Sequence, residues 1–276
     1  MINLMDYYNE LSDEAAKKIL KCTVQIFKRI TIIEPIALEP YASGVLVQLS
    51  DRFFMVTASH VIDTENLENL GILIDSSFTI LNGKVVFSKS EKDKELDQVD
   101  IAVWELAKEV VVDLQSKFTF LDLKCIDINH AIVTDRPYLL VGYPISRTKI
   151  IYTLKKVKSE PFVFTTKASN IEYTRLNCNK NINIVLDYEK EKILGEKTKG
   201  VHTGPDPYGI SGSGIWYLPK LIYKDIKNVE PHLIGILHTW VEAENVIIGS
   251  KMNIINELII EKFNIDIPHS STIGLS

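Results

Sequence analysis

Apolar and polar residues follow one pattern in the first 21 residues and another in the rest of the chain. Residues 1–21 carry acidic side chains followed by lysines, an order that suits the dipole of a helix, and Ser12 suits its N-terminal cap. From Cys22 onward, short apolar runs are separated by polar or glycine-containing stretches. The pattern therefore predicts an N-terminal helix followed by many short β-strands.

The predicted strands form two groups separated by a less regular stretch. They cover residues 22–27, 43–50, 53–58, 70–75, 83–88 and 99–106, and then 137–144, 149–154, 162–166, 181–187, 212–218, 232–240 and 246–250. This spacing is typical of an all-β barrel or sandwich and not of βαβ units. The charged stretch 88–98 is predicted to be an exposed loop. Apolar residues at helical spacing in 251–263 predict an amphipathic C-terminal helix of about 12 residues.

The two groups of strands predict four segments along the chain. We expect an N-terminal helical extension at 1–21, a first β-barrel at 22–130, a second β-barrel at 131–250, and a C-terminal helix and tail at 251–276. A length of 276 residues is enough for one large domain or two medium ones with a sizeable core.

Composition and charge exclude several classes of protein. Hydrophobic residues make up 46% of the chain, which argues against disorder, and the net charge of −5 is spread without long runs of one sign. A broad basic surface for nucleic acid is therefore not expected, and only a local patch at Lys155, Lys156 and Lys158 stays open. No apolar run approaches the roughly 20 residues of a membrane span, so no membrane partner is expected.

The cysteines and the N-terminus point to the cytoplasm. Cys22, Cys125 and Cys178 are odd in number and far apart, which favours small buried side chains over a disulfide framework or a zinc site. The N-terminus lacks the basic and apolar regions of a secretory signal. No two histidines have the i, i+4 spacing of a helical metal pair, so neither a metal nor a cofactor is expected.

Three short motifs carry candidate chemistry. In the first a histidine follows a predicted strand, and in the second an aspartate precedes one. In residues 53–62 an apolar strand ends in small residues and His60 follows, which places its ring at the rim of a barrel. Asp100 stands directly before the apolar strand 101–106, where a partly shielded carboxylate can orient an imidazole. Asp97 is a rival acid, but it lies further from the strand in a charged loop.

The third motif surrounds a serine with glycines. Gly209, Gly212 and Gly214 flank Ser211 before an apolar strand, so the backbone can turn sharply there. The amides of Gly209 and Ser211 can then point into one cavity and stabilise an oxyanion. Ser213 is the rival nucleophile.

Together the motifs stand in the order His, Asp, Ser, with spacings of 40 and 111 residues. They resemble the trypsin-like (chymotrypsin-fold) serine peptidases, whose signatures are T-A-x-H, D-I-A and G-x-S-G. The resemblance covers roughly residues 22–264, and the G-x-S-G-S variant looks most like the bacterial glutamyl-endopeptidase branch. The matching segments are Thr57–His60, Asp100–Ala102, Gly209–Gly212, Leu140–Pro144 and Gly235–Ile236.

The resemblance implies an all-β fold of two packed six-stranded-type antiparallel β-barrels, with an N-terminal and a C-terminal helix added. It implies a serine endopeptidase with His60, Asp100 and Ser211 as catalytic triad, Gly209 and Ser211 as oxyanion hole, and proteins or peptides as substrates. Val61 and Ile210 depart from secreted members, which often have Cys and Asp there. Activation by a freed N-terminal amine therefore lacks its partner, and gating by an activating protein partner or by the N-terminal helix stays open.

The preferred side chain at P1, the substrate residue before the cleaved bond, is left open. His238 lies on the strand that lines the specificity pocket in the family and would favour an acidic residue. Asp206 stands where the glutamyl endopeptidases usually have Thr and would favour Lys or Arg. Neither residue need contact P1, because His238 can equally lie near Asp100.

Two other classes of function compete with this reading. An α/β-hydrolase needs G-x-S-x-G with the acid and histidine after the serine, and this chain has neither feature. A catalytically idle trypsin-like fold that acts as a protein-binding scaffold stays open. The Lys-, Ile- and Asn-rich composition suits a low-GC bacterium, in which a cytoplasmic protease could be a regulated effector.

Overall fold

The structure is a computed structural model, and most of the chain can be described in it. The described residues are 4–31, 37–62, 64–89, 98–134, 136–151, 156–190, 193–194, 201–202, 204–219 and 226–272. Residues 90–97, most of the predicted loop 88–98, lie outside this set together with Asp97.

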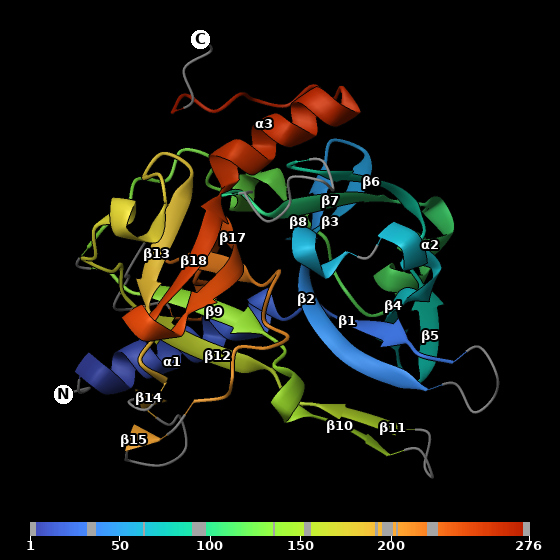
Figure 1. Cartoon of the computed structure of the whole chain (residues 1–276), viewed down its shortest axis with the longest axis horizontal. Coiled ribbons are helices and arrows are strands. Elements are labelled where there is room, and N and C mark those ends of the chain that lie inside the picture. The colour runs from blue at the N-terminus through green and yellow to red at the C-terminus, as the bar shows by residue number, and fades with distance from the viewer. Residues whose placement is uncertain are drawn as a thin grey trace.

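The first β-rich half forms one curled sheet of eight strands (Figure 1). Its order is β5-β4-β1-β2-β3-β7-β6, with the short β8 parallel to β2. The strands are β1 (Thr23–Arg29), β2 (Leu38–Leu49), β3 (Arg52–Ala58), β4 (Leu70–Ile74), β5 (Ser77–Ile80), β6 (Gly83–Phe87), β7 (Ile101–Leu106) and β8 (Leu121–Asp122).

The second half forms a six-stranded antiparallel sheet in the order β12-β9-β16-β17-β18-β13. Two separate hairpins, β10–β11 and β14–β15, stand beside it (Figure 1). The strands are β9 (Tyr138–Gly142), β10 (Thr148–Ile151), β11 (Lys156–Ser159), β12 (Phe162–Thr166), β13 (Asn183–Asp187), β14 (Ile193–Leu194), β15 (Val201–His202), β16 (Gly214–Tyr217), β17 (His232–Val241) and β18 (Val246–Lys251). These two curled sheets confirm the predicted two-barrel, chymotrypsin-like fold class.

Both terminal helices are present, but the first begins earlier than predicted. Helix α1 spans Leu4–Ile19 and α3 spans Met252–Phe263. Ser12 therefore lies inside α1, and its hydroxyl is 3.3 Å from the hydroxyl of Thr165. Ser12 as N-terminal cap was wrong. The helix starts earlier because an apolar stripe, which includes Leu11 and Ile19, packs against the barrels and stabilises the whole length.

A short helix, α2 (Lys108–Gln115), is not predicted by the residue pattern. Its run of three valines carries the propensity of a strand. In the structure Val110, Val111 and Leu114 face the core of the first barrel while Val112 is 61% exposed, which is the burial pattern of a helix. Tertiary packing thus overrides local propensity here.

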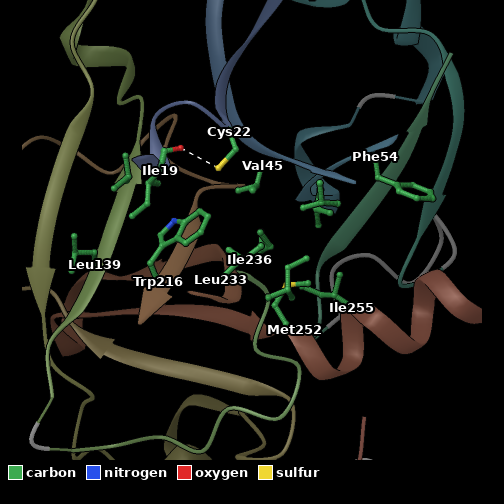
Figure 2. Close-up of a cluster of buried hydrophobic side chains, with 14 of the residues drawn as sticks. Ile19, Cys22, Val45, Phe54, Leu139, Trp216, Leu233, Ile236, Met252 and Ile255 are labelled. Carbon is green, nitrogen blue, oxygen red and sulfur yellow. Dashed lines mark hydrogen bonds between the residues drawn. The ribbon is translucent and has the colours of Figure 1, made fainter. Parts of the chain in front are cut away.

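One apolar cluster joins the two barrels and both terminal helices (Figure 2). Trp216 of the second barrel is fully buried at its centre, with Val45 of the first barrel and Met252 of α3 in the same cluster. Burial raises the pKa of the Cys22 thiol to about 12, and this thiol donates to the carbonyl of Ile19 over 3.2 Å. Cys22 is therefore an inert packing residue.

The three cysteines all have free thiols, with Cys22 buried and Cys125 and Cys178 partly buried. Among the described residues, no helix has the length and apolar character needed to cross a membrane.

Candidate active site

His60 is held at the rim of the first barrel by its two buried neighbours. Strand β3 ends at Ala58, and a single helical turn, Ser59–Val61, follows it directly. Ser59 and Val61 are buried in this turn, whereas the His60 side chain is 49% exposed. The turn thus fixes the backbone of His60 and leaves its ring open to solvent.

Asp100 reaches His60 because β3 and β7 are neighbours in the sheet. Ala58 pairs with Ile101, and the backbone of Asp100 is left-handed, with φ of 46°. One carboxylate oxygen accepts from the His60 amide at 2.9 Å, and the other accepts from its ring Nδ1–H at 2.6 Å. A carboxylate accepts but does not donate, so this contact places the ring proton on Nδ1 and leaves Nε2 as the acceptor.

The Ser211 loop needs glycine at two positions. Gly209 and Gly212 have φ of 92° and 86°, in the region that favours glycine. A Cβ on Gly212 would lie 2.0 Å from the carbonyl oxygen of Ser43 and 2.1 Å from the hydroxyl of Thr57. The Ser43 amide also donates to the Ser211 carbonyl at 2.9 Å. The loop comes from the second barrel but sits directly on the first.

Ser43, a buried serine that the sequence pattern did not indicate, supports the Ser211 loop. Ser43 lies in β2 and is fully buried. Its hydroxyl donates to the carbonyl of Gly209 and accepts from the amide of Tyr143, both at 2.9 Å. Its place at the start of the predicted strand 43–50 gives no distinct local signal for this role, because Gln48 and Ser50 in the same run are also polar. Its partners are 100 and 166 residues away in sequence.

The amides predicted to form an oxyanion hole are not used elsewhere. Among the residues that the structure describes, neither the Gly209 nor the Ser211 amide donates a hydrogen bond. Ile210 between them is buried in the apolar core of the second barrel. Secreted trypsin-like peptidases often have aspartate at the position of Ile210. In this chain the apolar packing of Ile210 and the Ser43 contact hold the loop instead.

Among the described residues the Ser211 hydroxyl does not bond to His60, and its connection to the His60–Asp100 pair runs through His238. The hydroxyl donates instead to the carbonyl of His238, over a long 3.4 Å. The ring Nδ1 of His238 is in turn 3.9 Å from the Asp100 carboxylate. Catalytic hydrogen bonds are often long or poorly aligned in unliganded sites and tighten only when substrate binds.

His238 is a buried residue at an irregularity of β17. The pairing with β18 shifts between Leu237 and Thr239, and such a bulge re-aims the side chain within it. The His238 ring shares a 2.8 Å hydrogen bond with Thr239 and lies beside Asp100. His238 thus lies near Asp100, one of the two placements that the sequence left open, and a role in binding P1 stays a prediction.

Asp206 is paired within the protein. Its carboxylate forms an ion pair with Lys190, whose ammonium lies 5.9 Å from the centre of the Trp240 ring. The side chain of Asp206 is half exposed. A basic P1 side chain would have to compete with Lys190 for this carboxylate, and the role of Asp206 stays a prediction.

Ser213, the rival nucleophile, is buried against β9. A Cβ on Gly142 would lie 1.8 Å from its hydroxyl, so the two strands are in close contact there. A substrate in the cleft cannot reach such a group. Within the described parts of the chain, no cluster of three or more His, Cys, Asp or Glu side chains could hold a metal ion.

A second His–Asp pair lies near the start of β17. His130 Nδ1 is 3.2 Å from the Asp127 carboxylate, and its Nε2 is 3.2 Å from the Tyr138 hydroxyl. The His130 side chain is only 5% exposed, and its ring packs against Tyr138 and Tyr217. The hydrogen bond from His130 holds the pKa of Asp127 below its ordinary value.

Comparisons with known proteins place the chain by fold only. No family model and no curated protein matches it. It is similar to the structure of HBP at atomic resolution, with 12% identity, a TM-score of 0.54, and coverage of 93% of this chain and 96% of that one. This likeness agrees with the two-barrel fold.

Two solved proteases are also similar at lower TM-score. A serine endoprotease from Yersinia pestis has 16% identity and a TM-score of 0.49, and the match covers 91% of this chain but 65% of that one. This chain thus spans less than two thirds of that protease. The thermostable serine protease AL20 from an extremophilic microorganism has 11% identity, a TM-score of 0.49, and coverage of 88% and 95%.

Proposed function

We propose that this chain is a serine endopeptidase that cleaves peptide bonds in proteins through Ser211, His60 and Asp100. The observation that carries the proposal is the double use of the Asp100 carboxylate by His60. One oxygen binds the backbone amide and the other binds the ring Nδ1–H, so the tautomer and the orientation of the ring are fixed together. A histidine without a catalytic task does not need an exposed ring held in this way.

The proposed reaction is acyl transfer in two steps. The Ser211 hydroxyl attacks the peptide carbonyl carbon, and His60 Nε2 accepts the hydroxyl proton. The C–N bond breaks when His60 returns that proton to the leaving nitrogen, and the acyl group stays on Ser211 as an ester. Water then attacks the ester with His60 again as base, which releases the acid and restores the serine. The Asp100 carboxylate stabilises the imidazolium in both steps.

The oxyanion in each step would be stabilised by the Gly209 and Ser211 amides. These amides are open among the described residues, and Gly209 and Ser211 are the two residues on either side of the buried Ile210. In the proposal Ser43 is a positioning residue, because it bonds the Gly209 carbonyl and not the substrate.

His238 and Asp206 give opposite expectations for the P1 preference. In the glutamyl-endopeptidase branch, which the Ser211 motif resembles, a pocket histidine favours an acidic P1 residue; His238 in the pocket would give that preference, and Asp206 would give a basic one. A cytoplasmic, regulated effector role in a bacterium rests on the sequence alone. A screen of peptides with Glu, Gln, Lys and Arg at P1 separates the two preferences.

One observation favours a second candidate, a catalytically idle protein-binding scaffold. The Ser211 hydroxyl bonds to the His238 carbonyl at 3.4 Å, and no bond to His60 exists among the described residues. A serine held in that rotamer in solution would not be deprotonated by His60, and the protein would then act by binding other proteins at its surface.

Labelling with a fluorophosphonate probe tests the proposal, because only an activated serine reacts well. We expect the wild type to be labelled and Ser211→Ala not to be. Ser213→Ala is a matched control two residues away, and it should be labelled like the wild type because the Ser213 hydroxyl is buried. A folded wild type that resists the probe would support the scaffold.

A further inference from the structure

A groove of about 460 Å³ opens between the first barrel and the β10–β11 hairpin. Strands β1, β4 and β5 contribute one wall, and the hairpin contributes the other. Phe27, Ile72 and Phe78 line it from the first barrel, and Ile150 and Val157 from the hairpin. Its volume lies in the range of specific ligand sites, and its walls are mainly apolar.

The hairpin has an apolar inner side and a basic outer side. Ile150 and Val157 pair with each other and are half-buried, whereas Lys149, Lys156 and Lys158 are exposed.

The charged residues that line the groove are mainly basic. Lys117 and Lys156 line it, and Asp75, the acidic residue in the described lining, forms an ion pair with Lys117 at 3.6 Å. Charge complementarity therefore favours an occupant that has apolar side chains for the groove and acidic side chains for the rim.

The groove is preformed because the first barrel holds the base of the hairpin. The Gln25 amide of β1 donates to the Thr148 hydroxyl at 2.8 Å and accepts from the Ser159 hydroxyl at 2.5 Å. Thr148 and Ser159 face each other across the two strands of the hairpin. A wall fixed in this way costs an incoming ligand little ordering.

One end of the groove adjoins the candidate active site. Tyr143 lines the groove, and its amide donates to the same Ser43 hydroxyl that binds the Gly209 carbonyl. A Cβ on Gly209 would lie 2.8 Å from the Tyr143 carbonyl oxygen. A polypeptide with its scissile bond at Ser211 can therefore continue past Tyr143 into the groove.

We propose that the groove binds the part of a protein substrate that follows the scissile bond, as an extended apolar segment flanked by acidic residues. The inference rests on the proposed function, and it extends that function to the substrate class. The direction follows from His60, which belongs to the first barrel and must protonate the leaving nitrogen. The leaving side of the substrate thus faces the first barrel, whose strands β1, β4 and β5 form the wall of the groove.

Binding is tested without catalysis, on full-length Ser211→Ala protein. The probe is a fluorescein-labelled peptide, Glu-Ile-Phe-Glu-Glu-Phe-Ile-Glu, followed by fluorescence anisotropy. We expect saturable binding that the version with Ser at all apolar positions lacks. Val157→Asp in the same protein should weaken binding by about tenfold or more, because it places a carboxylate in the apolar wall.

Charge variants of the hairpin separate the groove from the general charge of the surface. Lys156→Glu, at the rim, should weaken binding about threefold or more at low salt, whereas Lys149→Glu, which lies off the groove on the same hairpin, should change it less than twofold. Equal effects of the two variants, or binding that survives Val157→Asp, would overturn the proposal. Dimerisation that Val157→Asp abolishes, in place of peptide binding, would also overturn it and make a second copy the occupant.

Cleavage kinetics then test whether the groove binds the substrate segment that follows the scissile bond. Two quenched substrates share one cleavable sequence, followed either by the acidic-apolar segment or by its Ser-substituted version. We expect the first to have about tenfold higher kcat/KM, mainly through KM, and Val157→Asp to bring the ratio close to one. A serine that labels with fluorophosphonate but shows a ratio of one would leave the endopeptidase standing and refute the groove. Absent labelling with intact peptide binding would refute the endopeptidase alone.

Discussion

Two hydrogen-bonded histidine–aspartate pairs in the described part of the molecule have opposite surroundings. His60 and Asp100 are 2.6 Å apart at the barrel rim, with the imidazole side chain 49% exposed. His130 and Asp127 are 3.2 Å apart and the histidine is 5% exposed. Both nitrogens of His130 have partners, because Tyr138 takes the second.

The difference shows what a reactive pair requires beyond its two residue types. A base must have one nitrogen fixed by a carboxylate and the other open to a substrate. His60 meets this condition, since its Nε2 has no hydrogen-bond partner among the described residues. The His130 pair is a closed network, which stabilises the fold and cannot take a proton from a substrate without being dismantled.

The largest expected effect is on the open pair. Asp100→Asn should lower kcat by about 10⁴-fold, because the amide cannot hold the His60 tautomer or stabilise its cation. Asparagine tolerates the left-handed backbone of position 100, so the fold should persist. Steady-state kinetics together with the thermal midpoint measure both parts. Retained turnover would show that the open pair is not the base and its partner.

A smaller loss is expected when the Ser211 loop loses its support. Ser43→Ala leaves the Gly209 carbonyl and the Tyr143 amide without this partner, so the oxyanion donors should be less well placed. We expect kcat to fall about 10- to 100-fold, less than for removal of a donor itself, with KM nearly unchanged. Active sites are titrated with fluorophosphonate first. A loss only in the active fraction would indicate a purely structural role.

The closed pair should affect stability and not turnover. His130→Ala removes one hydrogen bond from the partly buried Asp127 carboxylate and one from the buried Tyr138 hydroxyl. We expect the free energy of unfolding to fall by about 1–3 kcal/mol, with kcat per folded molecule within about twofold of wild type. Urea denaturation and kinetics measure the two quantities. A large kcat effect would break the contrast between the pairs.

The smallest effect is a pH dependence of the closed pair. The folded pKa of Asp127 lies below the ordinary value near 3.9 because His130 bonds its carboxylate. The unfolded state therefore binds the proton first as pH falls. The stabilisation is present above about pH 4 and is lost as pH falls through the lower folded pKa. Asp127→Asn should flatten the pH dependence of unfolding free energy between pH 4 and 2, and an unchanged slope would contradict this.

Elements with strong local signals could be predicted from the sequence. Short alternating runs predicted most strands, and the apolar spacing of 251–263 predicted α3 within a residue. The sequence also places His60 and Asp100 beside the ends of predicted strands, whereas the pairing of β3 with β7 that brings them together is a tertiary contact.

Features that depend on distant contacts could not be predicted in this way. The role of Ser43 depends on a carbonyl 166 residues away, and the placement of His238 depends on an irregular register with β18. The start of α1 depends on the barrel surface that buries Leu11. Each is set by packing between segments, for which one-dimensional periodicity carries no information.

The close packing of Gly212 against the first barrel determines how the Ser211 loop can move. The loop that carries Ser211 is connected to the second barrel, yet its backbone touches Ser43 and Thr57 with no room for even a methyl group. Ser211 therefore moves with the barrel that carries His60. If a bound protein or thermal unfolding separates the two barrels, the loop should lose its contacts with Ser43 and Thr57 before His60 separates from Asp100. The contact between the Ser211 loop and the first barrel is thus where a change in barrel packing would alter the geometry of the candidate site.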